Sequence, residues 1–413
     1  SATFTSGRMR EADLAGKARY YTALLRETHK AVKAVRPETR ILGGAAHSVP
    51  LAWFRALAAE GAAAWMDAVV IHPYTTAPEQ LRRQIELLRG IPGFASMPIE
   101  VTEFGHADPD AAPAHLLKSY CQMALAGVTR AVWYPLNTRG DGMVPLIDAA
   151  GRVTAVGRTY RLIRDRLSGR TVTDAAPDAF THACRFGDRA LVIWGEPRAV
   201  TLAVPGLRAV DPNGATVERP RLSRDRPLLI LSDGPGVALG GTVRLGPQRV
   251  VADSFHQFAY PGQPGDPFER FARAGGAEIP FALGPGQERG GVPWTPYLRG
   301  PRDGLLRMSA EWLLPSVAGS DPVEIVHRYR APRDMTVDLE AVIDPAARST
   351  DGVTVTLSLN GSVLHAQVLE GRSVLRRKAI SLSAGDRLEL AVGPGASAEG
   401  DVTGYRITLR RSR

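Results

Sequence analysis

The chain has 413 residues, enough for two or three domains of roughly 100–200 residues each. Its hydrophobic content of 44% is that of a globular protein, and no stretch approaches the roughly 20 apolar residues of a membrane span. The net charge of +9 comes from arginines spread along the chain, without the Lys/Arg-rich block of a nucleic-acid-binding protein. We therefore expect a folded protein with no membrane span and no nucleic-acid partner.

The two cysteines, Cys121 and Cys184, fall in a predicted helix and a predicted strand. We expect them to be buried free thiols, and they are too few to build a metal cluster. The first residues are polar and lack the apolar core of a signal peptide. Because the segment that follows fits the middle of a repeating domain, we expect the chain to begin inside a domain. Nothing in the sequence predicts a cofactor or a metal ion.

Helices and strands alternate over residues 1–168, where apolar residues recur at helical spacing or form short continuous runs. The predicted helices are 19–36, 51–64, 78–90, 115–127 and 154–168, and the predicted strands are 40–44, 66–74, 97–105 and 128–136. The strands are apolar on both faces, as parallel strands covered by helices are. This alternation fits a doubly wound sheet or a (β/α)8 TIM barrel.

The carboxyl ends of the predicted strands distinguish these two folds. His72 and Tyr74 end one strand, Glu103 ends the next, and Trp133 and Tyr134 end the fourth. The glycine-rich GxGxxG turn of a nucleotide-binding sheet does not occur in this region. In a TIM barrel this face builds the active site, and an acid with an aromatic wall is typical of a sugar pocket. The strand ends therefore favour a barrel.

The motifs LGG, VVIHPY, PIEVTEFG and AVWYPL resemble, in this order, strands 5 to 8 of a clan A glycoside hydrolase barrel. Within that clan they are most similar to families 39 and 5. The resemblance implies that Glu103 is the catalytic nucleophile. It also implies that His72, Tyr74 and Trp133 bind the substrate, although a core tryptophan and a hydrogen-bonded structural histidine are the alternatives.

Three further residues lie beside these strand ends and are candidates for substrate binding. Tyr134 follows Trp133, His106 lies in the loop after Glu103, and Asn137 lies in the loop after the fourth strand. Polar loop residues are more often simply solvated. Glu100 lies on the strand of Glu103, and we expect it to face the helices or to pair with an arginine.

One departure from the family pattern concerns the acid/base residue, which in the family follows an asparagine at the end of strand 4. The sequence has three asparagines, Asn137, Asn213 and Asn360, and none precedes a glutamate. A full barrel needs roughly 250 residues, more than residues 1–168 provide. We expect strands 5–8 only, with the acid/base glutamate supplied by an N-terminal segment absent from this chain. That barrel half would come from a separate chain or a second copy.

The remaining residues are rich in predicted strands. We expect a small β-domain over 169–240, following the partial barrel of 1–168. Period-two alternation and turns such as NG and AGD predict antiparallel strands over 241–413. The expected architecture is a jelly-roll β-sandwich, which resembles modules attached to polysaccharide-active enzymes. In this module Trp294, Tyr297 and Trp312 could stack on sugars or pack in the core.

The chain is therefore predicted to combine an α/β domain with all-β domains. The favoured function is a secreted or periplasmic retaining glycoside hydrolase acting on a polysaccharide or exopolysaccharide. The alternative is a non-catalytic carbohydrate-binding or scaffold protein built on a degenerate or split barrel. A third possibility is an unrelated α/β protein in which Glu103 has no catalytic role.

Overall fold

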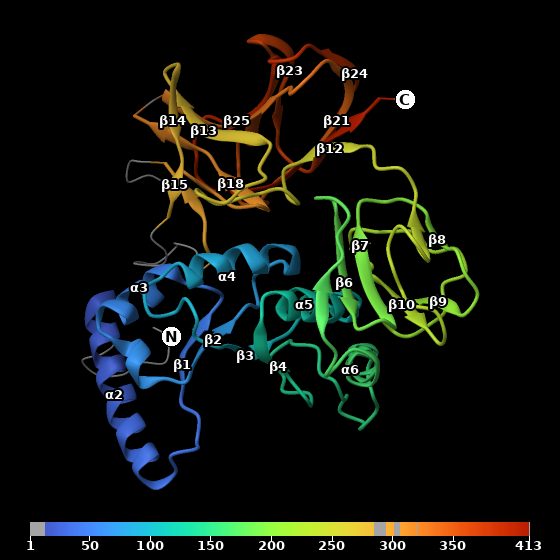
Figure 1. Cartoon of the computed structure of the whole chain (residues 1–413). Coiled ribbons are helices and arrows are strands. Elements are labelled where there is room, and N and C mark those ends of the chain that lie inside the picture. Colours follow the sequence, from blue (N-terminus) through green and yellow to red (C-terminus); the bar gives the residue numbers. More distant parts are fainter. Residues whose placement is uncertain (1–12, 285–294, 301–305, 320, 413) are drawn as a thin grey trace. The chain divides into compact units, whose positions relative to one another are not determined.

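The computed structural model describes residues 13–284, 295–300, 306–319 and 321–412 (Figure 1). The chain divides into two compact units. The first contains the residues up to 247 together with residue 295, and the second contains 248–284 and the residues from 296 onward. The division at residue 168 that the sequence predicts lies within the first unit and remains a prediction. Trp294 lies outside the described residues.

A four-stranded parallel sheet organises the first unit. Its strands are β1 (Leu42–His47), β2 (Ala68–His72), β3 (Ile99–Phe104) and β4 (Val128–Trp133). They lie in the order β1-β2-β3-β4, and each neighbouring pair is parallel. A doubly wound sheet reverses its strand order at a switch point, whereas this sheet follows the chain without reversal. Its extension to a closed barrel remains a prediction.

The helices of the first unit alternate with these strands. They are α2 (Leu14–Val35), α3 (Leu51–Ala59), α4 (Leu81–Arg89), α5 (Ala112–Leu125) and α6 (Ala155–Arg166), with short 3-10 turns η2 (Ala62–Trp65) and η3 (Pro78–Gln80). Each helix packs against the next one along the chain. Because right-handed crossovers between neighbouring strands place their helices on the same side, the helices form one layer on one face of the sheet.

The first unit also contains two antiparallel sheets. The larger one has the order β5-β6-β7-β10-β9, and the smaller pairs β8 with β11. Their bounds are β5 (Val172–Asp174), β6 (Thr181–Phe186), β7 (Ala190–Gly195), β8 (Val200–Leu202), β9 (Leu207–Val210), β10 (Leu228–Ser232) and β11 (Val243–Leu245). Leu191, Ile193 and Ile230 form the centre of their shared apolar core.

A disulfide joins Cys121 on α5 to Cys184 on β6, with the two Cα atoms 5.8 Å apart. The expectation of two free thiols is therefore wrong. Helix α5 packs against β5, β6 and β7, and this packing brings together two cysteines that lie 63 residues apart. Both cysteines are fully buried, as the sequence predicts.

A buried ion pair lies at the same interface. Glu79 Oε1 accepts hydrogen bonds from Lys118 Nζ at 2.9 Å and from Trp194 Nε1 at 2.8 Å. Burial opposes the ionisation of Glu79, but the positive charge and hydrogen bond of Lys118 outweigh it and lower the pKa of Glu79 to about 2. A carboxylate from η3, an ammonium from α5 and an indole from β7 thus hold the antiparallel sheet against the helices.

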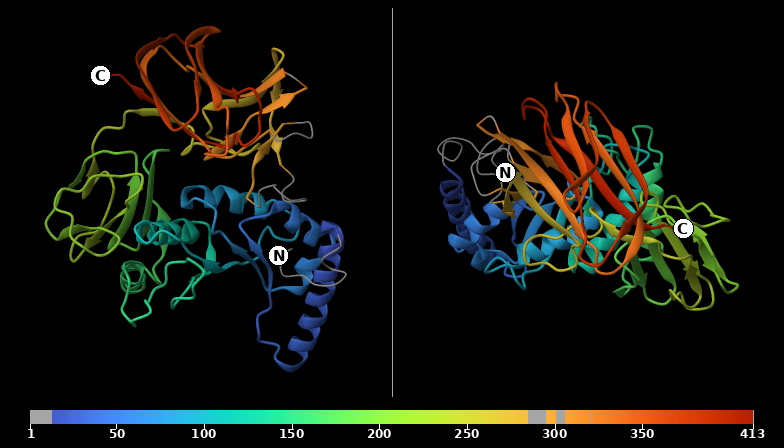
Figure 2. Two further views of the ribbon diagram at one scale, coloured as in Figure 1. Left: turned by 180° about the vertical axis from the view of Figure 1, so that it is seen from behind. Right: turned by 90° about the horizontal axis from the view of Figure 1, so that it is seen from above.

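The second unit consists of two antiparallel sheets (Figure 2). The first contains β12 (Val250–Asp253), β15 (Ala282–Leu283), β16 (Leu298–Arg299), β17 (Arg307–Met308), β18 (Trp312–Leu314), β21 (Met335–Pro345), β24 (Ser373–Leu382) and β26 (Thr403–Arg411). The second contains β13 (Phe268–Ala274), β14 (Ala277–Pro280), β19 (Ser316–Ala318), β20 (Asp321–Arg330), β22 (Val353–Leu359), β23 (Ser362–Leu369) and β25 (Arg387–Pro394).

The two sheets pack face to face. The ring of His327 on β20 lies 4.7 Å from the ring of Tyr405 on β26, so side chains of both sheets meet in one core. Strand β21 alternates buried and partly exposed residues, which is the period-two pattern that the sequence shows. Tyr297 is buried and Trp312 is partly buried, so Tyr297 belongs to the core.

Breaking the disulfide should destabilise the first unit. Closing a loop of this length restricts the unfolded chain, so the double variant Cys121→Ala/Cys184→Ala should lose about 2–4 kcal/mol of unfolding free energy. Urea denaturation with and without a reductant measures this loss. The reductant should weaken the wild type and leave the double variant unchanged. Equal sensitivity of both proteins to the reductant would contradict the bridge.

The stability contributed by Glu79 should depend on acid pH. Its pKa is lowered from 4.5 to about 2, so the contribution is complete above pH 4.5 and is lost as the pH falls toward 2. The variant Glu79→Gln should therefore lose less unfolding free energy than the wild type over this pH range. Urea denaturation at a series of pH values tests this. Parallel curves for the two proteins would show that Glu79 is not the titrating group.

Candidate active site at the carboxyl ends of the parallel strands

Three ionisable side chains lie at the carboxyl ends of neighbouring strands. His47 is the last residue of β1, His72 is the last residue of β2, and Glu103 is the penultimate residue of β3. His47 and His72 are directly paired in the strand register. Because parallel strands end at the same edge of a sheet, these side chains meet where α/β proteins place their active sites.

A hydrogen bond joins the central pair of this site. Tyr74 Oη donates to Glu103 Oε2 at 3.1 Å, and 46% of the Glu103 side chain remains exposed. Burial, and then the negative charge and hydrogen bond of Glu103, raise the pKa of Tyr74 well above its usual value. Tyr74 therefore keeps its proton at neutral and moderately alkaline pH and remains a donor to the carboxylate.

His72 lies on the same carboxylate. Its Nδ1 is 3.8 Å from Glu103 Oε2, and its Nε2 shares a hydrogen bond of 2.8 Å with Thr102 Oγ1. Burial lowers the pKa of His72 more than the Glu103 charge raises it. The imidazole is therefore neutral at pH 7, and it contacts Glu103 as a polar neighbour rather than as a cation.

His47 is a site residue to which the sequence assigns little weight. Its ring stacks on Tyr74 with the ring centres 6.1 Å apart and the planes inclined by 15°. The predicted strand stops at residue 44, whereas β1 continues through a register shift between Gly43 and Ala46. Extending the strand by three residues would have placed His47 at its carboxyl end, so strand length is the signal that reveals it.

An open pocket of about 580 Å³ adjoins Tyr74, the hydrogen-bond partner of Glu103, and Glu103 itself is not one of its lining residues. It is lined by Tyr74, Gly105, His106, Ala107, Asp108, Tyr134, Asp141 and Met143. Two of the predicted site residues, Tyr134 and His106, are therefore part of this pocket together with Tyr74. Tyr134 Oη donates to Asp141 Oδ2 at 2.7 Å, and this hydrogen bond lowers the pKa of Asp141.

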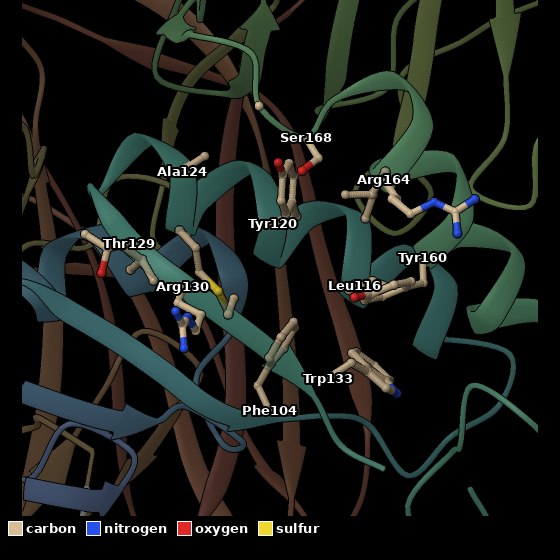
Figure 3. A pocket seen from close by; sticks show the side chains of 15 residues that line it. Phe104, Leu116, Tyr120, Ala124, Thr129, Arg130, Trp133, Tyr160, Arg164 and Ser168 are labelled. Atoms are coloured by element: carbon tan, nitrogen blue, oxygen red, sulfur yellow. The ribbon is translucent and has the colours of Figure 1, made fainter. Parts of the chain in front are cut away.

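The structure does not bring Trp133 to Glu103. Trp133 pairs in register with Phe104, and their rings pack edge to face with centres 5.2 Å apart. Both aromatic residues line a second pocket of about 350 Å³ with Tyr120 and Tyr160 of the helix layer (Figure 3). Trp133 therefore belongs to the helix side of the sheet.

The last two predicted residues occupy loops. The backbone N–H of Asp108 donates to His106 Nδ1 at 3.0 Å, which orients the ring at the pocket wall. Asn137 is exposed and forms a bridge with Ile147, and it does not line the pocket. Glu100 is fully buried and pairs with Arg40, which confirms the arginine partner expected for it.

The described residues contain no group of three or more His, Cys, Asp and Glu side chains arranged to hold a metal ion. At the strand ends, the described residues bring together the Glu103 carboxylate, the Tyr74 phenol as its donor, the imidazoles of His47 and His72, and an adjacent pocket. Such a carboxylate can accept a proton or attack an electrophilic carbon. Within the same ranges, no helix is both long and apolar enough for a membrane crossing.

Comparison with solved structures finds similarity to glycoside hydrolases. A family 39 β-xylosidase from Caulobacter crescentus is 19% identical with a TM-score of 0.38, over 52% of this chain and 62% of its own length. The family 86 β-porphyranase BpGH86A from Bacteroides plebeius is 9% identical with a TM-score of 0.41, over 96% of this chain and 74% of its own. Bacteroides uniformis β-glucuronidase 2 is 11% identical with a TM-score of 0.32, over 95% of this chain and 50% of its own length.

This chain thus spans less than two thirds of the length of the β-xylosidase. No protein-family model and no curated protein matches the chain. At these identities and TM-scores the similarities carry no argument about mechanism or substrate, so the case for a function rests on the residues of the site.

The raised pKa of Tyr74 should depend on the Glu103 charge. The variant Glu103→Gln removes that charge, so the pKa of Tyr74 should fall toward its usual value while remaining above it, since burial persists. Carbon-13 NMR of the tyrosine rings across an alkaline titration measures it. Glu38→Gln, which changes a carboxylate outside the site, should have no effect. An unchanged Tyr74 pKa in Glu103→Gln would show that the two residues do not interact.

Proposed function

We propose that this chain carries the nucleophile of a retaining glycoside hydrolase that acts on a polysaccharide or exopolysaccharide. Glu103 attacks the anomeric carbon of the sugar and forms a covalent glycosyl-enzyme, which water then hydrolyses. The observation that supports this most directly is the hydrogen bond from Tyr74 to Glu103 at the carboxyl edge of the parallel sheet. The similarity of the four strand motifs to clan A hydrolases agrees with this role.

The surroundings of Glu103 suit a nucleophile. Attack requires an ionised carboxylate with one oxygen accessible to the sugar, and almost half of the Glu103 side chain is exposed. Tyr74 remains protonated and donates to Oε2, which holds the carboxylate in place with its other oxygen available. His72 is neutral and close to the same oxygen, so it does not neutralise the nucleophile by forming an ion pair.

The acid/base residue is expected from outside this chain. A general acid must be protonated before it can donate to the leaving oxygen, so its pKa needs to be raised. Asp141 is a carboxylate in the pocket, but the hydrogen bond from Tyr134 lowers its pKa and makes it a poor acid. An N-terminal barrel half, as a separate chain or a second copy, would supply the acid. The outer edge of β1, which pairs with no strand in the described ranges, is where it would join.

The substrate would bind in the pocket beside Glu103. Tyr74, Tyr134 and His106 line it and present rings and polar groups to a sugar. Asn137 lies in a loop outside the pocket, and its proposed role is to contact the outer sugars of a longer substrate. The position of Trp133 on the helix side does not support the stacking role suggested by the resemblance. The Cys121–Cys184 disulfide is compatible with a secreted or periplasmic location, where disulfides persist.

A second candidate is a non-catalytic carbohydrate-binding or scaffold protein. The observation that favours it is that the hydrogen bond from Tyr134 lowers the pKa of Asp141, a carboxylate of the pocket, and so disfavours its action as a general acid. Such a protein would bind sugar in the same pocket without forming a covalent intermediate. The two functions therefore differ in whether Glu103 reacts.

A mechanism-based 2-deoxy-2-fluoroglycoside with an activated leaving group should label Glu103. The activated leaving group departs without protonation, so the reaction tests the nucleophile in the absence of the acid. Intact-mass spectrometry should show one added glycosyl group, and peptide mapping should place it on Glu103. Glu103→Gln should slow labelling by at least about 10⁴-fold, the scale of losing a nucleophile.

Glu100→Gln is the matched control, because Glu100 lies on the same strand but is buried in an ion pair with Arg40. It should still be labelled. A panel of xylo-, gluco- and galacto-configured reagents covers the sugar classes. If oligosaccharides bind but no reagent in the panel labels Glu103, the result would support the non-catalytic function and contradict the proposal of a hydrolase.

A further inference from the structure

Besides Glu79, five acidic residues are buried in the described part of the chain, and four of them are paired with arginine. The buried acids are Glu100, Glu196, Asp253, Glu389 and Asp401. The arginine partners of the first four, in order, are Arg40, Arg224, Arg406 and Arg328. Asp401 is fully buried in the second unit without a Lys or Arg partner among the described residues. An isolated buried carboxylate is costly, so something else must compensate its charge.

A second carboxylate lies near Asp401. Asp401 Oδ1 accepts a hydrogen bond from Ser349 Oγ at 2.6 Å, and Asp351 Oδ2 accepts one from the Ser397 N–H at 2.6 Å. The other oxygen of each carboxylate, Asp401 Oδ2 and Asp351 Oδ1, is buried and has no hydrogen-bond partner within the described ranges. Two carboxylates thus each keep one oxygen unpaired.

The two carboxylates converge on Gly395. A Cβ atom added to Gly395 would lie 2.8 Å from Asp351 Cγ, and the Gly395 N–H is a hydrogen-bond donor to the Asp401 carboxylate. The same Cβ atom would lie 2.8 Å from the carbonyl oxygen of Asp351 and 2.7 Å from that of Gly352. Two carboxylates and two backbone carbonyls therefore meet where loop 346–352 packs against loop 395–402.

Such a cluster of like charge can be compensated by a proton or by a cation. Two carboxylates that share one buried loop junction repel each other when both are ionised. Carboxylate and carbonyl oxygens are the ligands of hard cations, whereas zinc prefers His and Cys. Irregular loops that offer carboxylates and carbonyls suit Ca²⁺ better than Mg²⁺, because Mg²⁺ demands near-ideal octahedral geometry.

We propose that Asp351 and Asp401 bind one Ca²⁺ ion, which links loop 346–352 to loop 395–402 in the second unit. The unpaired oxygen of each aspartate is a ligand, and backbone carbonyls and water complete the coordination. The ion replaces the arginine that compensates the other buried acids. This site is independent of the proposed glycosidase function, because all of its residues belong to the sandwich unit. It also goes beyond the sequence, which predicts no metal.

Isothermal titration calorimetry of the full chain, stripped with EDTA and titrated with CaCl₂, tests the proposal. The wild type should bind about one equivalent of Ca²⁺ and bind Mg²⁺ more weakly. Asp401→Asn and Asp351→Asn should each weaken Ca²⁺ binding by at least about tenfold, the loss seen for even an outer-shell partner. Glu370→Gln, which alters an exposed carboxylate in the turn between β23 and β24, should bind as the wild type does.

Thermal unfolding separates a metal ligand from a purely structural residue. Ca²⁺ should raise the unfolding temperature of the wild type but not that of Asp401→Asn. In EDTA this variant should unfold at the same temperature as the wild type or higher, because one of the two repelling charges is gone. The proposal would be overturned if the wild type bound no Ca²⁺ or if all variants bound it equally. It would also be overturned if Asp401→Asn unfolded at a lower temperature than the wild type in EDTA and Ca²⁺ had no effect on the wild type.

Discussion

The parallel pairing of four strands in chain order is the constraint on which the first unit depends. It places every helix on one face of the sheet and every strand end at one edge. Residues that lie about 30 positions apart in the sequence, such as Tyr74 and Glu103, therefore meet within hydrogen-bond distance. The pocket, the neutral His72 and the accessible carboxylate are all consequences of this one arrangement.

The negative charges of several buried carboxylates are compensated by nearby cations. Glu79 and Lys118 neutralise each other where α5 meets the antiparallel sheet, and an indole N–H of Trp194 completes the group. Glu196 and Asp253 are likewise buried and pair with Arg224 and Arg406. The site of Glu103 differs, because its partners are a phenol and a neutral imidazole that leave the negative charge available. The structural carboxylates are neutralised, whereas Glu103, the proposed nucleophile, is only oriented by its partners.

Much of the fold could be predicted from the sequence, because periodicity reports which face of each element is buried. The helices and strands over residues 14–166 occur close to their predicted positions, and the described residues from 248 onward form antiparallel strands, as period-two alternation predicts. The edge that gathers His72, Tyr74 and Glu103 also follows from strand order. His47 received little weight because the predicted strand ends at the glycines, whereas a register shift carries β1 past them.

Other features depend on tertiary contacts that a local pattern does not report. Trp133 was assigned to the pocket, but one residue of strand register decides the face of a side chain, and Trp133 shares the face of Phe104. The pairing of Cys121 with Cys184 arises from the docking of a sheet on a helix. Asp401 is an ordinary loop aspartate in the sequence, and only its burial beside Asp351 distinguishes it.

The disulfide has a consequence for proteolysis. It encloses the chain between Cys121 and Cys184 in a covalent ring, and that ring contains the exposed segment 136–142 after β4. A protease that cuts this segment would leave two pieces still joined through sulfur. The nicked protein would migrate as an intact chain on a non-reducing gel and would separate into fragments only after the thiols are freed.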